Sequence, residues 1–499
     1  MSKVNSHLGV GDRLTQAPAP ELILSAYTLE TDYGPLLYHG MSLADLAHTV
    51  MLIEAGIVPG HIGARLLGAL LELHALPVQS FPFDPARGDA YSNREYELRQ
   101  RAAEAADWLQ AGRARREAST VGYLLVTRRA LLTVAEALLA LMQALLDRAA
   151  ANVNTLMPDY TYLQIAQPTT LAHYLLTFVQ PMTRDLARLQ MAFDHANRSP
   201  AGIGSTNGSR LPLNRERLAQ LLGFRGLVCH TRDAMWQPDG PVEIMSALTI
   251  LLLNADRLAE DLQIWATAEF NYIELADEHS RVSVIMPQKK NPYGLAYARG
   301  VARDSIGKLV STATLQATTS GQVDNRIFTY SAVPQALTQT AQTLNLLAGI
   351  ITSMKVNTAL MHQRAQQAYS GATDLAETIM LTFGLSARAA HRIVGQAVRL
   401  AASLARAIDA QLLDEAAEAV IKRPLQLSDR FIAESLAPQA IIETRMVVGG
   451  AAPEPVWQMI ADFRATEIEY RSWVAEQQHA LANAESALIK TAESLCQPT

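Results

Sequence analysis

Three long stretches of this chain are so apolar that each can only form a buried helix. They are residues 127–157, 241–270 and 335–354, and the first reads TRRALLTVAEALLALMQALLDRAAANVNTLM. As a helix, that stretch would be roughly 45 Å long. A helix that is apolar round most of its circumference must be covered on nearly all sides. One chain has few ways of covering three such helices, so we expect a long helical bundle completed by sister subunits.

The composition narrows the class of protein. The net charge of −6 argues against a nucleic-acid-binding surface but leaves room for a local pocket for a small anion. Two distant cysteines, Cys229 and Cys496, suit a reducing compartment and give no metal-binding spacing. The first residues have no apolar signal region, and apolar runs such as 247–253 are too short to cross a bilayer. We therefore expect a cytoplasmic protein with neither a nucleic-acid nor a membrane partner.

Changes in composition divide the chain into three regions. We expect an N-terminal helical domain over residues 1–117, a central domain of long helices over 118–365, and a small C-terminal helical domain over 366–499. Because no segment alternates convincingly between apolar and polar residues, the predicted fold is all-α, with a few short strands at most in loops. Loops rich in Gly, Ser, Asn and Pro lie at 197–214, 278–292 and 445–456.

Three polar segments carry the candidate chemistry. They are AGRARREAST (111–120), DYTYLQIAQPTT (159–170) and SVIMPQKKNPYGLAYARG (283–300). Each lies at the end of a long apolar helix, and loops at the ends of a bundle can gather into one site. In isolation, the paired Lys289 and Lys290 indicate either a solvated turn or a site for an anion.

These segments resemble conserved blocks of the fumarase/aspartase superfamily, and within it of argininosuccinate lyase. SVIMPQKKNP matches the signature loop, TYLQIAQP the second block and GRARREA the family's GRSRNDQ. Two more blocks appear in the family's order, ATDLAETIMLTFGLSARAAHRIVGQAV (372–398) and VGGAAP (448–453). The resemblance implies a three-domain all-α homotetramer around a twenty-helix core. It also implies active sites built from three subunits, with no cofactor and no metal.

The resemblance assigns the carboxylate end of the site to the signature loop. The family eliminates an amine from an N-substituted aspartate to give fumarate, so the site must stabilise extra negative charge on a carboxylate. Ser283 matches the catalytic base, and a hydroxyl serves as a base only where cations and N–H donors favour the alkoxide. Lys289 and Asn291 would hold the carboxylate, Met286 of the same loop would contact substrate, and Lys290 would point away.

Further substrate contacts are implied by the other blocks. Thr161 and Gln164 match polar residues of the second block, and Arg115 matches an arginine that can grip a second carboxylate. Arg116 stands where the family has a neutral asparagine, so it would repel a guanidinium. The segment DNRIFTYSA (324–332) keeps Asn325 and Arg326 as candidate substrate contacts but lacks the family's Gln and Lys.

The departures from the family pattern concern proton transfer and loop freedom. The family's histidine is Tyr162 here, and the glutamate tied to it is Ala296. A tyrosine hydroxyl, with an unperturbed pKa of about 10, could act as the acid or could shape the pocket. Val282 and Val284 replace small residues of the signature loop, so we expect that loop to be stiffer.

Three hypotheses follow from this pattern. The first is a carbon–nitrogen lyase that joins fumarate reversibly to an amine other than arginine. The second is an ordinary argininosuccinate lyase of arginine biosynthesis. The third is a non-catalytic homologue that keeps the scaffold. Ser283, Lys289 and Asn291 argue against the third, and the altered amine end argues against the second.

Overall fold

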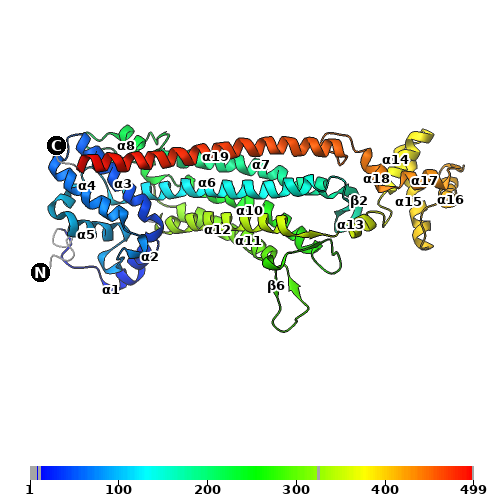
Figure 1. The fold of residues 1–499 in the computed structure, drawn as a ribbon, viewed down its shortest axis with the longest axis horizontal. Helices are drawn as coiled ribbons and strands as arrows, with labels where there is room; N and C mark the ends of the chain where they lie inside the picture. Colours follow the sequence, from blue (N-terminus) through cyan, green and yellow to red (C-terminus); the bar gives the residue numbers. More distant parts are fainter. Residues whose placement is uncertain (1–7, 9–12, 323–325, 497–499) are drawn as a thin grey trace.

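The computed structural model describes Leu8 and residues 13–322 and 326–496, and its fold is all-α as predicted. Five long antiparallel helices make a bundle, and a sixth returns along it (Figure 1). These helices are α6 (Arg115–Ala150), α7 (Leu171–Ala196), α10 (Asp239–Trp265), α11 (Tyr293–Gln316), α12 (Arg326–Ser353) and α19 (Pro453–Cys496). The shorter helices are α1 (Pro20–Leu22), α2 (Thr28–Asp32), α3 (Gly34–Glu54), α4 (Gly60–Ala75), α5 (Ala90–Ala102), α8 (Arg215–Leu221), α9 (Thr231–Trp236), α13 (Thr358–Ala365), α14 (Ala372–Phe383), α15 (Ala387–Ser403), α16 (Ala410–Ile421), α17 (Asp429–Ser435) and α18 (Pro438–Glu443).

The predicted helices are present, but their ends differ from the prediction. α6 begins twelve residues before residue 127 and ends at Ala150, where the chain turns into a hairpin. α12 begins at Arg326 and accommodates Pro334 in its interior. The predicted start of α6 is too late because its first turn is polar, and that of α12 because Pro334 lies in its interior.

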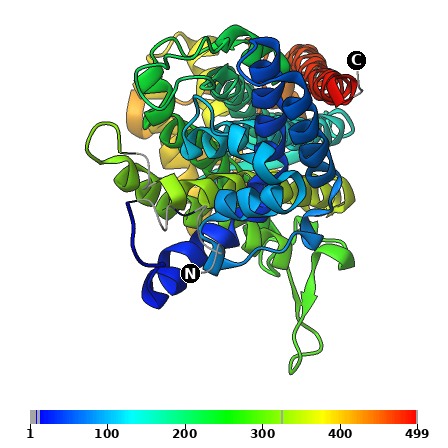
Figure 2. The same cartoon turned by 90° about the vertical axis from the view of Figure 1, so that its left-hand side faces the viewer.

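The N-terminal helices pack against one end of the bundle, and an end-on view shows them there (Figure 2). Their contact with α6 depends on two glycines. A Cβ placed on Gly40 of α3 would lie 2.4 Å from the carbonyl oxygen of Gly122 in α6. The two helices therefore cross with their backbones in contact, and the crossing fixes the N-terminal region relative to the start of α6.

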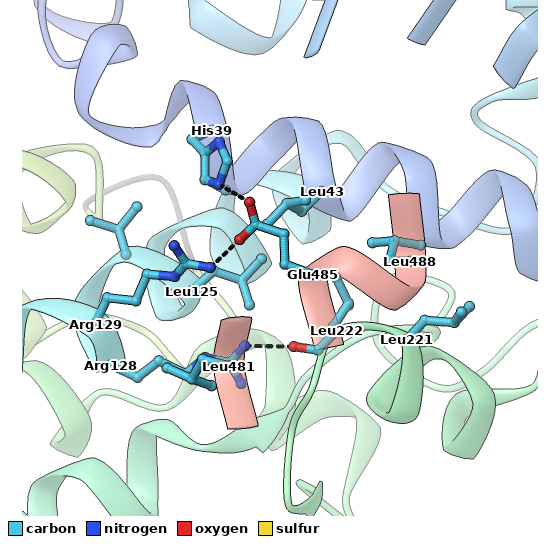
Figure 3. Close-up of a pocket in the computed structure, with 12 residues that line it drawn as sticks. His39, Leu43, Leu125, Arg128, Arg129, Leu221, Leu222, Leu481, Glu485 and Leu488 are labelled. Atoms are coloured by element: carbon cyan, nitrogen blue, oxygen red, sulfur yellow. Dashed lines mark hydrogen bonds and ion pairs between the residues drawn. The ribbon is translucent and has the colours of Figure 1, made fainter. Parts of the chain in front are cut away.

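α19 is fastened to this end by charged groups as well as by leucines (Figure 3). The Glu485 carboxylate accepts a hydrogen bond from His39 of α3 at 3.0 Å and pairs with Arg129 of α6. Leu481 and Leu488 of α19 are buried on either side of Glu485. The last helix thus ties the N-terminal helices to the bundle.

Strands are short and lie in loops. β1 (Leu156–Thr161) and β2 (Gln164–Thr170) form an antiparallel hairpin directly after α6, with a bulge between Pro158 and Tyr160. The remaining strands are two-residue pairings: β3 (Arg198–Ser199) with β4 (Gly226–Leu227), β5 (Ile273–Glu274) with β8 (Lys355–Val356), and β6 (Arg281–Val282) with β7 (Lys290–Asn291).

A separate small core lies at the far end of the molecule. It is formed by α14 to α17, with Ile379, Ile393 and Leu413 among its fully buried side chains. The main core runs through the N-terminal helices, the bundle and α19. The C-terminal part of the chain therefore contributes to both cores.

Two helices, Gly34–Glu54 and Arg115–Ala150, are long and apolar enough to span a membrane by composition. Within their most apolar windows, 83% and 61% of the residues are buried inside the protein. Their apolar character is thus accounted for by packing in the main core.

Candidate active site

The signature loop is a short hairpin that projects from the side of the bundle (Figures 1 and 2). β6 pairs with β7 in the register Arg281 with Asn291, and the Ser283 amide donates to the Lys289 carbonyl oxygen at 3.2 Å. The Ser283 hydroxyl oxygen accepts a hydrogen bond from the Met286 amide at 3.1 Å. The loop therefore directs an N–H donor at the candidate base, the kind of contact that favours an alkoxide.

The two adjacent lysines have different surroundings. Lys290 forms ion pairs with Glu274 at 2.8 Å and with Asp277 at 2.7 Å, and these contacts raise its pKa. Lys289 is exposed and has no ion pair among the residues that the structure describes. Its ammonium is available to an incoming anion, whereas Lys290 holds the base of the loop. The Asn291 amide donates to the Arg281 carbonyl oxygen at 2.9 Å and helps close the hairpin.

Tyr162 and Leu163 form the two-residue turn of the β1–β2 hairpin. Both have left-handed backbone angles, with φ of 55° and 58°, and Tyr162 is 99% exposed. Thr161 and Gln164 face each other across this turn, and both are exposed. The candidate acid and the two polar contacts of the second block therefore lie together at an exposed tip.

The arginines at the start of α6 contact two buried carboxylates that the sequence analysis did not identify. Arg116 pairs with Glu30 at 2.8 Å and lies 3.9 Å from Asp89, while Arg115 lies 3.3 Å from Asp89. Burial raises the pKa of Glu30, and Arg116 opposes that shift. The sequence does not predict these pairs. Glu30 lies in an ordinary LETDY segment, and Asp89 is a common type of residue at the start of a helix.

These ion pairs correct the expectation for Arg116. We predicted a positive charge that repels a guanidinium, but the Glu30 and Asp89 carboxylates balance that charge. The charged groups near the start of α6 therefore form a network of ion pairs rather than a basic patch.

The remaining predicted contacts are scattered. Met286 is 39% exposed in the signature loop, and Arg326 is buried at the start of α12. Ala296, the position of the family's glutamate, is exposed on the first turn of α11. Asn325 lies outside the described residues.

The first two of the three segments lie at opposite ends of α6 in one chain. α6 spans 36 residues, and Arg115 lies at its start while the Tyr162 hairpin follows its end (Figure 1). At 1.5 Å per residue the helix separates them by about 54 Å. A rigid helix allows no closure over that distance, so Arg115 and Tyr162 of one chain cannot contact the same small molecule.

Among the described residues, His39, His74 and Glu485 have ligand atoms within 4.8 Å of one another, a spacing that suits a metal ion. The Glu485 carboxylate is already shared between His39 and Arg129. The group lies in the α19 contact rather than beside the signature loop, and we assign it a structural role.

The bundle, the signature hairpin and the paired charges together define a helical lyase of the fumarase/aspartase type. Residues 54–307 match the model of the lyase family, and residues 369–443 match that of the argininosuccinate lyase C-terminal region. Argininosuccinate lyase from Methanocaldococcus jannaschii is 31% identical and covers 91% of this chain and 93% of its own length. The enzyme from Methanosarcina acetivorans is 32% identical and covers 92% of each.

The chain belongs to the argininosuccinate lyase family and is an enzyme, a carbon–nitrogen lyase. A solved structure of EDDS lyase in complex with formate is equally similar, with 30% identity, 97% coverage of both chains and a TM-score of 0.86. A variant of EDDS lyase with bound fumarate matches to the same extent. The hypothesis of a non-catalytic homologue therefore has no support.

Proposed function

We propose that the protein reversibly eliminates an amine other than arginine from an N-substituted aspartate, giving fumarate. The choice of amine rests on one observation: the carboxylates near the start of α6 are already paired with arginines of this chain. A guanidinium needs a free bidentate acceptor, but Glu30 is held by Arg116 and Asp89 lies against Arg115. An amine partner that is smaller, more apolar or carries its own carboxylate suits this network better.

The carboxylate end follows the family chemistry. Ser283 removes the proton next to the substrate carboxylate, and Lys289 and Asn291 stabilise the doubly charged intermediate. Thr161, Gln164 and Met286 contact the substrate, and Arg115 grips its second carboxylate. The fumarate bound to the EDDS lyase variant supports a dicarboxylate ligand of this size.

Tyr162 has two possible roles in this mechanism. Its hydroxyl protonates the leaving amine, or the ring shapes the pocket without transferring a proton. The exposed tip position is compatible with both roles, because a tip can insert into a site on a sister subunit.

We propose a homotetramer in which each site takes segments from three chains. The separation along α6 supports this arrangement, and so does the exposed apolar surface of the bundle. That surface includes Ile250 and Leu253 of α10 and Ile306 and Val310 of α11. The twenty-helix core, the three-domain division and a cytoplasmic location belong to the same proposal, which invokes no cofactor.

Ordinary argininosuccinate lyase is the second candidate, because the curated relatives at 31% and 32% identity carry that name. EDDS lyase at 30% identity shows that a related chain of the same fold has a different named substrate. The amine must therefore be decided by experiment.

The test is to mix the purified protein with fumarate and a panel of amines and to follow the loss of fumarate absorbance in the ultraviolet. We expect turnover with at least one amine that carries an apolar group or a carboxylate. Lys289→Met removes the charge and keeps most of the volume, so it should abolish turnover in the same assay. Absence of turnover with every amine would contradict the proposal.

A further inference from the structure

Arg326 is a buried cation without an acceptor among the described residues. It lies at the start of α12 with 4% of its surface exposed, and its Nε and Nη2 atoms have no hydrogen-bond partner in that part of the chain. Nor does an ion pair join it to any residue in the described parts of the chain. A guanidinium withdrawn from water is costly unless an anion compensates its charge.

The three other buried arginines of the described chain all donate to acceptors, although each keeps one nitrogen without a partner. Arg94 and Arg113 bind the Asp45 carboxylate at 3.0 Å and 2.7 Å. Arg128 donates to two backbone carbonyl groups and to an asparagine side chain. Arg326 differs from all three, because no hydrogen bond or ion pair joins it to an acceptor among the described residues.

A cavity of about 430 Å³ adjoins Arg326. It lies where α6, α10 and α12 begin, and its size is typical of a site for a small molecule. Apart from Arg326, none of the predicted substrate contacts lines it. Apolar walls are supplied by Leu124, Leu227, Val228 and Ile244, and polar groups by Thr120 and Tyr123.

The charges around the cavity limit the kind of anion that fits. Glu243 is bound to His195 at 2.6 Å, and Asp239 is exposed at the edge. These two carboxylates oppose a dianion such as fumarate. Arg198, also exposed on the lining, adds a second positive charge. One carboxylate with an apolar body matches this pattern.

We propose that this cavity binds a small monocarboxylate, separately from the catalytic site, with the carboxylate on the Arg326 guanidinium. This role replaces the substrate contact that the sequence predicts for Arg326. A planar guanidinium offers two parallel N–H groups to a carboxylate. The hydrocarbon part of the ligand lies against Leu124, Val228 and Ile244, where it displaces water. The ligand is either a simple carboxylic acid or an amino acid. Asp239 at the edge favours the amino acid, because its carboxylate can accept a hydrogen bond from the ammonium group.

Calorimetric binding to the intact protein tests the proposal with three probes of matched skeleton. These probes are 4-methylpentanoate, L-leucine and 3-methylbutylamine. We expect saturable binding of 4-methylpentanoate or L-leucine and none of the amine, which lacks the carboxylate. Arg326→Met should weaken binding at least tenfold, and it orphans no partner, so the variant should fold. Arg388→Met, which changes an exposed arginine of α15, is the matched control and should bind as the unchanged protein does.

Val228→Phe fills the cavity without touching the charge and should also weaken binding, whether or not the Arg326 variant is stable. Absence of saturable binding to the unchanged protein would overturn the proposal. So would equal affinity in Arg326→Met, or displacement of the ligand by fumarate in simple competition, which would place it in the catalytic site.

Discussion

Tyr162 stands where the family has its histidine, and its position bears on which group protonates the leaving amine. It occupies a left-handed turn position at an exposed hairpin tip, a place where Gly or Asn would cost less. If its hydroxyl is the acid, Tyr162→Phe should lower kcat by about 10²-fold or more. If the ring only shapes the pocket, kcat should change little. Steady-state kinetics on the best substrate separates the two roles.

Ser283 carries the assignment of the base. Ser283→Ala removes the hydroxyl whose oxygen accepts the Met286 amide, and it leaves the loop pairing of β6 and β7 in place. We expect kcat to fall by orders of magnitude while KM changes less, because the group acts in the transition state. Circular dichroism and the size of the oligomer should be unchanged. A variant with nearly normal kcat would remove Ser283 from the mechanism.

We expect Glu117 to make the free energy of unfolding depend on pH. Burial raises its pKa from 4.5 to about 7, although the Gly202 and Ile203 amides donate to its carboxylate. Between these two pH values the folded state holds a proton that the unfolded state releases, so stability falls as pH rises through this window. Glu117→Gln should remove that part of the decline. Urea unfolding at pH 5 and pH 8 measures it, with the exposed Glu216→Gln as control. An unchanged pH slope would contradict the argument.

The motif residues could be predicted from the sequence, but the carboxylates that pair with the arginines could not. Ser283, Lys289 and Tyr162 could be named because their neighbours match a known block. Glu30 and Asp89 could not, because they lie 86 and 26 positions from their arginine partners, and such pairs follow from helix packing rather than from local pattern.

At the scale of elements, the crossing of α3 and α6 is the most sensitive contact. Gly40→Ala would place a methyl group 2.4 Å from the Gly122 carbonyl oxygen, which belongs to the helix backbone and cannot turn away as a flexible side chain could. We expect a loss of stability of about 1–3 kcal/mol. Gly68→Ala in α4 is the control, because its Cβ meets nothing within 4 Å and should be neutral or stabilising. Equal unfolding free energies for the two variants would show that the helices can separate at no cost.

The long helices could be predicted from the sequence because their apolar residues leave no alternative to burial. The β1–β2 hairpin could not. Its turn is Tyr-Leu rather than a glycine or asparagine pair, and Pro158 interrupts the first strand. The end of α6 was misplaced for the same reason, since the apolar run continues into the strand.

In the proposed tetramer, sister chains complete each active site. Arg115→Met and Ser283→Ala should each be inactive alone. Co-expressed, they should form mixed tetramers in which some sites take an unchanged Arg115 and an unchanged Ser283 from different chains. We expect activity well above that of either parent. Activity no greater than the sum of the parents would mean that one chain supplies both residues to a site.

The choice of amine is tested by the steady-state rate of fumarate release from argininosuccinate, compared with release from the N-substituted aspartate that the amine panel identifies. We predict that argininosuccinate is cleaved poorly or not at all. The Asp89 and Glu30 carboxylates that could hold its guanidinium are already paired with Arg115 and Arg116. The other substrate should be cleaved with a kcat/KM in the ordinary enzyme range, roughly 10⁴ M⁻¹s⁻¹ or above. A value in that range for argininosuccinate itself would contradict the account and make the protein an ordinary argininosuccinate lyase.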